Sequence, residues 1–222
     1  MGKIDLNTLR ISGKIGSIVA YTTKYGKQVY RKYTIPNDPK TPKQQAYRMR
    51  FGLVNKSLSP FNKIIKKGFN DQHNAYRSVI SHMLHYGVEG EYPDFSINYS
   101  EIKVADGKLA LPNNITATID NDLSKLQLTW NPLKVSNSKY NSSYDNVNIV
   151  CFNDELQEAV SSFGLAKRGD GELEVDYINI FDKGVSENGR NSKPINPDNL
   201  HFWLYLTSRD YSINSISSYV NL

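Results

Sequence analysis

Residues 37–51 read Asn-Asp-Pro-Lys-Thr-Pro-Lys-Gln-Gln-Ala-Tyr-Arg-Met-Arg-Phe and contain the clearest helix start in the chain. The Thr41 hydroxyl can accept a hydrogen bond from an unpaired N–H group of the first helical turn. Gln44 stands three residues later, where its side chain can reach back to the Thr41 N–H and complete a capping box. Pro42 takes the first helical position, where its missing N–H group costs nothing. The stretch therefore predicts a helix from Pro42 to about Leu58.

This predicted helix is amphipathic, and its polar side is basic. Its apolar residues recur at helical spacing and are Ala46, Met49, Leu53 and Val54, with Tyr47, Phe51 and Leu58 on a flanking stripe. Its polar side carries Lys43, Arg48, Arg50 and Lys56. Two interpretations remain open. The basic face is either the solvated side of an ordinary surface helix or a surface that docks on an acidic partner.

A pair of strands is predicted before this helix, and two more helices after it. Residues 15–23 and 27–34 are rich in β-branched and aromatic residues, and Gly26 between them can supply the positive φ of a tight turn. Ser59-Pro60 opens a second helix, and a third is expected over about 72–85. The apolar stripe of the second helix is Phe61, Ile64, Ile65 and Phe69, beside Lys63, Lys66 and Lys67.

From Asp94 onward the hydrophobic pattern changes to a period of two, which is typical of strands. A strand is expected over 96–104, up to a turn at 105–107. Further short strands are expected over 115–119, 125–130, 146–152, 172–178, 201–207 and 215–220. Short strands separated by turn-rich segments, with no long helix between them, favour an antiparallel β-sandwich.

The expected fold class is therefore α+β, with an N-terminal β-hairpin plus helices and a C-terminal antiparallel β-sandwich. The expected division is a basic hairpin-and-helix module (1–93), a connector (94–112) and a β-sandwich domain (113–222).

Charge is distributed very unevenly along the 222 residues. Residues 1–70 hold 15 Lys and Arg against 2 Asp and Glu, a balance of +13. Residues 71–222 hold 12 against 20, a balance of −8. Such asymmetry bears on partners rather than on fold. Nucleic acid, an acidic protein, or the acidic part of another copy would each satisfy the basic end, and the last would favour head-to-tail association.

Composition excludes several classes of site and protein. The single Cys151 rules out an intrachain disulfide and a cysteine-built zinc site, and its apolar neighbours suggest a buried thiol. No apolar run approaches the roughly 20 residues that span a bilayer, and no signal-peptide pattern is found. A cytoplasmic protein without membrane contact is therefore expected.

No catalytic constellation is found in the sequence. Nucleotide-binding glycine patterns and a Gly-x-Ser-x-Gly nucleophile turn are absent, and the chain has four histidines. His82 and His85 could share a helix face, but neither a carboxylate nor a cysteine stands at a supporting spacing for a metal. We therefore expect no enzyme, no cofactor and no small-molecule substrate.

Several short motifs carry a resemblance to a known family. They are Gly13-Lys14-Ile15-Gly16-Ser17-Ile18-Val19, Gly26-Lys27-Gln28-Val29-Tyr30-Arg31, and Pro39-Lys40-Thr41-Pro42-Lys43-Gln44-Gln45 with Arg48 and Phe51. Leu128-Thr129-Trp130, Asp145, Arg168 and Tyr205 extend it into the C-terminal half. The sequence resembles an uncharacterised bacterial family of about this length, a domain of unknown function. The resemblance implies a basic hairpin and helices followed by an immunoglobulin- or fibronectin-like sandwich, and implies no known activity.

Two functions are considered. The first is a non-catalytic binding or structural protein whose basic N-terminal module contacts a protein partner or another copy. The second is nucleic-acid binding through residues 14–67, where basic residues alternate with tyrosines that could stack on bases. The expected contact residues are Arg31, Lys43, Arg48, Arg50, Lys63, Lys66 and Lys67.

Overall fold

The computed structural model describes residues 12–120, 124–133, 137–177, 181 and 196–221. The chain forms two compact units, which divide between Pro42 and Lys43. Helices and antiparallel strands in several sheets give an α+β protein, as expected.

The first unit is a three-stranded antiparallel sheet, which we call the arm. Its strands are β1 (Gly13–Ile15), β2 (Ile18–Thr22) and β3 (Gln28–Lys32), in the order β1-β2-β3. Gly26 has a φ of +78° in the turn between β2 and β3, which confirms the predicted turn. Gly16 has a φ of +58° in the turn between β1 and β2, so the arm has one strand more than predicted.

The second unit begins with a layer of helices. These are α1 (Pro42–Leu58), the 3-10 turn η1 (Ser59–Phe61), α2 (Asn62–Gly68), α3 (Ala75–His82) and the π-turn η2 (Met83–Gly87). The predicted start and end of α1 are confirmed, and so is the restart at Ser59-Pro60. Phe61, Ile64, Ile65 and Phe69 are all buried, as their spacing predicted.

The strand predicted over 96–104 is wrong. Two short strands, β4 (Val88–Glu91) and β5 (Asp94–Ile97), form a hairpin instead, with a cis peptide bond at Tyr92-Pro93. The chain then turns through a 3-10 helix, η3 (Tyr99–Glu101). The cause of this turn is Asn98, whose side-chain oxygen accepts a hydrogen bond from the Ser100 N–H at 3.1 Å and caps η3.

Two larger antiparallel sheets follow. The first has the order β11-β10-β13-β14 and the second β12-β7-β6. Their strands are β6 (Thr116–Asp120), β7 (Lys125–Thr129), β10 (Asn146–Asn153), β11 (Glu158–Lys167), β12 (Glu172–Asp176), β13 (Leu200–Thr207) and β14 (Ser218–Val220). A two-residue pair, β8 (Asn137–Ser138) and β9 (Asn141–Ser142), and the 3-10 turn η4 (Pro197–Asn199) complete the described elements. Strand β11 was not predicted from the sequence.

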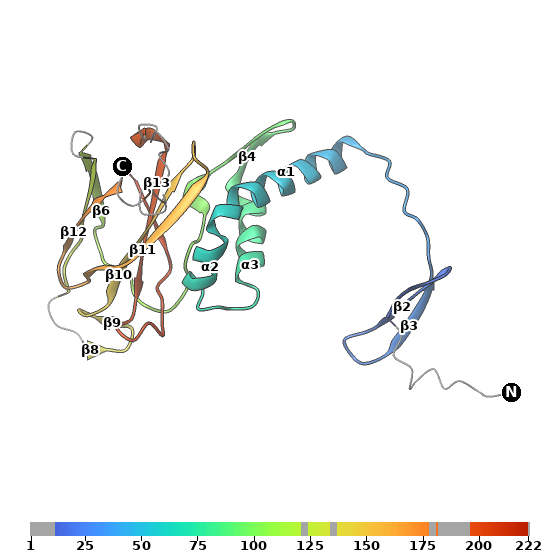
Figure 1. The fold of residues 1–222 in the computed structure, drawn as a ribbon, viewed down its shortest axis with the longest axis horizontal. Helices are drawn as coiled ribbons and strands as arrows, with labels where there is room; N and C mark the ends of the chain where they lie inside the picture. The colour runs from blue at the N-terminus through green and yellow to red at the C-terminus, as the bar shows by residue number, and fades with distance from the viewer. Residues whose placement is uncertain (1–11, 121–123, 134–136, 178–180, 182–195, 222) are drawn as a thin grey trace, which may run out of the picture. The chain divides into compact units, whose positions relative to one another are not determined.

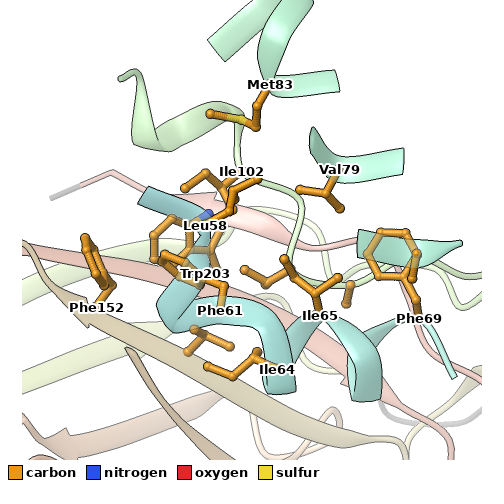
Figure 2. Packing of buried hydrophobic residues seen from close by; sticks show 14 of the residues in the cluster. Leu58, Phe61, Ile64, Ile65, Phe69, Val79, Met83, Ile102, Phe152 and Trp203 are labelled. Carbon is orange, nitrogen blue, oxygen red and sulfur yellow. The ribbon is translucent and has the colours of Figure 1, made fainter. Parts of the chain in front are cut away.

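The central strands of the four-stranded sheet, β10 and β13, are buried on both faces, which places this sheet in the middle of three layers (Figure 1). Val150 and Phe152 of β10 belong to a core shared with the helices, whereas Ile149 and Cys151 belong to a core shared with β6, β7 and β12. Figure 2 shows the helix-side core, where Phe61 lies among Phe152, Trp203 and the side chains of α2 and α3. The helices therefore pack on one face of this sheet and the three-stranded sheet on the other.

The helices thus share a core with the strands of the second unit. The division expected from the sequence grouped them with the hairpin, in residues 1–93. In the structure only the arm is separate, because the apolar stripes of α1, α2 and α3 are buried against β10 and β13.

A polar pair lies inside the second unit. The Asp145 and Arg168 side chains are buried with 3.8 Å between their charged groups. Arg168 donates hydrogen bonds to the Ala110 and Leu111 carbonyls at 2.8 and 3.2 Å, and its own carbonyl accepts from Trp130 Nε1 at 2.9 Å. Burial raises the pKa of Asp145, although Arg168 and the Ser142 N–H oppose the rise. These contacts fix the chain segments around β7 and β10.

Candidate interaction surface

The arm is a sheet with almost no core of its own. Ala20 is its buried apolar residue, whereas Ile15 and Ile18 are 55% and 47% exposed. Four arm tyrosines also count as exposed: Tyr21, Tyr25, Tyr30 and Tyr33. A small sheet is stable when one of its faces is apolar and packs against a helix or another sheet. The arm therefore presents apolar side chains that no described part of its own unit covers.

The strand register places these side chains on both faces of the arm. Lys14, Val19 and Arg31 stand opposite one another, so they share one face, whereas Ile15, Ile18 and Lys32 share the other. Each face thus combines large apolar groups with cations. Residues 13–32 hold five Lys and Arg and no Asp or Glu. The Lys14 ammonium lies 3.8 Å from the centre of the Tyr33 ring, a cation–π contact that holds both on one face.

Helix α1 carries an exposed apolar surface of its own, in the second unit. Tyr47, Phe51, Val54 and Leu58 follow one stripe at spacings of four, three and four. Val54 and Leu58 are fully buried, but Tyr47 and Phe51 are 63% and 50% exposed. Met49, which shares the predicted helical spacing of Val54, is 46% exposed as well. The core covers only the C-terminal half of α1, which leaves the stripe uncovered over its first turns.

The predicted contact residues fall into separate groups. Arg31 lies on the arm, Lys43 and Arg48 are exposed on α1, and Lys63, Lys66 and Lys67 are exposed on α2. Lys67 lies 4.6 Å from the centre of the Phe163 ring on β11. The α2 lysines alternate with the buried Ile64 and Ile65, so they form the solvent side of that helix.

Arg50 joins α1 to two later segments of its own unit. Its guanidinium donates a 2.8 Å hydrogen bond to the Leu84 carbonyl and lies 5.7 Å from the centre of the Phe95 ring. Tyr92 donates to the Gln45 side chain at 3.3 Å. These contacts tie α1 to η2 and to the β4–β5 hairpin. Arg50 therefore positions α1.

Two histidines have side-chain partners that the spacing of residues in the sequence did not predict. His82 Nε2 lies 3.2 Å from Glu101 Oε2, although the two are 19 residues apart. His201 Nδ1 lies 2.8 Å from the Tyr219 hydroxyl, and its ring centre is 4.4 Å from that of Tyr99. Burial lowers the pKa of His201, and the charge of Asp154 opposes this only in part. Within the described residues, no group of three or more His, Cys, Asp or Glu is placed to hold a metal ion.

Among the helices of the described segments, none combines the length and the apolar character needed to cross a bilayer.

A model of a family of unknown function, DUF6266, matches residues 10–185. The chain belongs to this family. The DUF6266 match covers the arm, the helices and the strands up to β12, which is most of the chain. The resemblance to an uncharacterised domain family is therefore confirmed at the level of the family. No curated protein and no solved structure matches the chain.

Proposed function

We propose that this DUF6266 chain is a non-catalytic binding or assembly protein, whose basic arm contacts a protein partner or another copy. The observation that carries the proposal is the coreless arm, where apolar residues on both faces meet solvent. Burying apolar surface is worth about 25 cal/mol per Å². A partner whose surface covers either face of the arm would therefore stabilise the arm and at the same time hold the complex together. A cytoplasmic location is part of the proposal.

The uncovered half of α1 supports the same proposal from the second unit. Tyr47 and Phe51 continue a stripe whose later members are core residues. Exposed aromatic residues beside arginine are typical of protein contact surfaces. Under the proposal, Arg31, Lys43 and Arg48 contact the partner, and Lys63, Lys66 and Lys67 add positive charge that attracts it. Arg50 holds α1 in position.

We also infer that strands β6 to β14 form an immunoglobulin- or fibronectin-like sandwich. Support comes from the strand order. With the two-residue pair β8–β9 left aside, seven strands remain, and the first, second and fifth of them make one sheet, β12-β7-β6. The third, sixth and seventh make the other, and the fourth strand, β11, pairs with the third. Immunoglobulin domains distribute their strands in this way, with an extra strand beside the third in some of them. Such a sandwich would serve as a rigid base for the arm and the helices.

Cross-linking from the arm tests the proposal. A photoreactive amino acid replaces Tyr30, which is 41% exposed on the arm, in the full chain. Tyr140, which is 40% exposed in the second unit, gives a matched control position. Position 30 is expected to yield covalent protein adducts in cell extract or with other copies, because a partner covers the arm. Equal yields from positions 30 and 140 would contradict the proposal.

Nucleic-acid binding is the second candidate, and the exposed lysines of α2 favour it. Lys63, Lys66 and Lys67 line the solvent side of one helix, while the arm adds tyrosines and five further cations. Phosphate contacts together with aromatic stacking are how many proteins hold single strands. The same cross-linking experiment separates the candidates. Adducts from position 30 that nuclease removes would favour nucleic acid, and adducts that only protease removes would favour a protein partner.

A further inference from the structure

We propose that the chain associates with itself head to tail, with the arm of one copy docked on the outer face of the β6–β7–β12 sheet of the next. This inference rests on the proposed function and names the partner. It is carried by the distribution of charge over the layers of the second unit and by the composition of the arm.

The outer face of the β6–β7–β12 sheet is acidic. Its outward residues are Thr116, Thr118, Asp120, Lys125, Gln127, Thr129, Glu172, Glu174 and Asp176. Four of these are acids and one is a cation. Lys125 Nζ lies 2.6 Å from Glu174 Oε1, and its cross-strand neighbours are Asp120 and Asp176. One lysine thus stands among three carboxylates, and the face keeps a formal balance of −3.

The opposite side of the second unit is basic. Residues 43–87, which form the helix layer, hold eight Lys and Arg against one Asp. The four-stranded sheet separates this layer from the acidic face (Figure 1). The second unit is therefore electrically polar across its layers. A field of this kind orients two copies so that the basic end of one meets the acidic face of another.

Charge selects the acidic face among the surfaces that could receive the arm. Two arms would repel, since residues 13–32 carry five cations and no acid. The β4–β5 hairpin has exposed Glu89, Glu91 and Asp94, but it packs beside α1, whose cations outnumber these acids. On the β6–β7–β12 face, acids outnumber cations, and the threonine methyl groups offer apolar contact to the tyrosines and isoleucines of the arm.

Strand edges add a second source of contact. Among the described strands, β1 and β3 each pair on one side only, and so do β6 and β12. Backbone pairing between two such edges is a common mode of association. The arm and the acidic face are different surfaces of the same chain. Each copy can therefore dock its arm on a second copy and receive the arm of a third on its acidic face. Contacts of this kind make chains or rings rather than closed pairs.

The test reverses charge on each surface in the full chain. The arm variant is Arg31→Glu with Lys32→Glu, which changes one cation on each face of the arm. The face variant is Glu172→Lys with Glu174→Lys, at two exposed positions of β12. The matched control is Glu91→Lys with Glu158→Lys, which makes the same change of net charge at exposed sites elsewhere. Light scattering after size exclusion measures the molar mass of each.

At about 50 mM salt, the molar mass of the wild type and of the control is expected to rise with protein concentration. At about 300 mM salt it is expected to fall back to that of a monomer, because salt screens the attraction between the charged surfaces. Each variant alone is expected to stay a monomer. The arm variant lowers the charge of residues 13–32 from +5 to +1 and so removes most of the attraction, and the face variant turns the balance of the face from −3 to +1, so that it repels the arm. An equimolar mixture of the two variants is expected to regain mass up to a dimer, because the unchanged arm of the face variant meets the unchanged acidic face of the arm variant.

Three results would overturn the head-to-tail proposal: a wild type that stays monomeric at every concentration, a face variant that associates like the wild type, or a mixture that does not regain mass. None of them decides the broader proposed function. A monomeric wild type whose position 30 still cross-links to another protein would leave the binding role standing and remove only self-association.

Discussion

Replacing Phe61 with alanine is expected to lower the free energy of unfolding of the second unit by about 3–5 kcal/mol. The Phe61 side chain is fully buried where η1 joins α1 to α2. Its ring centre lies 4.9 Å from that of Phe152 and 5.3 Å from that of Trp203, in a tilted and an edge-on arrangement. Figure 2 shows that it fills the space between helices and sheet, so truncation leaves a cavity that close packing cannot remove.

Urea unfolding followed by tryptophan fluorescence measures this loss, because Trp130 and Trp203 both lie in the second unit. Phe51→Ala is the matched control on the same helix layer. Phe51 is half exposed, so its truncation is expected to cost less than about 1 kcal/mol. Equal losses for the two variants would show that the first turns of α1 are covered in the isolated chain, contrary to the structure.

Replacing Asn214 with alanine is expected to lower the free energy of unfolding by about 2–4 kcal/mol, because one buried side chain that makes several hydrogen bonds is lost and the Thr207 hydroxyl loses its acceptor. The Asn214 amide donates to the Gly68 carbonyl at 2.8 Å and to the Lys67 carbonyl at 3.1 Å, at the end of α2, where these carbonyls also accept the Asp106 and Asn70 N–H groups. Its oxygen accepts from the Thr207 hydroxyl at 3.0 Å. One side chain thus fastens α2 to the end of β13.

Asn55→Ala is the control for this substitution. The Asn55 amide donates to the Phe51 carbonyl of its own helix at 2.7 Å in an exposed position, and water can replace that bond. We expect a loss within about 0.5 kcal/mol for the control. If Asn214→Ala cost no more than Asn55→Ala, the join between α2 and the sheet would depend on apolar packing alone.

Much of the local structure could be predicted from the sequence. The start of α1 follows from Thr41 and Pro42, and the turn before β3 follows from Gly26. Each signal depends on backbone chemistry within a few residues. Strand β11 escaped prediction because Ser161, Ser162 and Gly164 interrupt its apolar pattern. Its place is set by pairing with β10, which sequence periodicity does not report.

The candidate surface was only partly predictable. The basic residues could be identified from the sequence, but the exposed fraction of each side chain could not be predicted from it. Tyr47 and Phe51 have the same spacing as Val54 and Leu58, and only the packing of the second unit around α1 decides which pair is covered. From the sequence, Arg50 is indistinguishable from the other basic residues of α1. Its contacts with Leu84 and Phe95 depend on the tertiary fold. The acidic face is built from strands that lie about 50 residues apart in the sequence, so it emerges only once β12 pairs with β7.

The most direct measurement on the central claim, that the arm is a surface made to be covered, is amide hydrogen exchange of residues 13–32 in the full chain. At high dilution these amides are expected to exchange at least about tenfold faster than those of β10 and β13, because a coreless sheet opens readily. Protection should rise when a partner or another copy binds. Arm amides as slow as those of β10 in the dilute monomer would contradict the claim, since the sheet would then be stable without any cover.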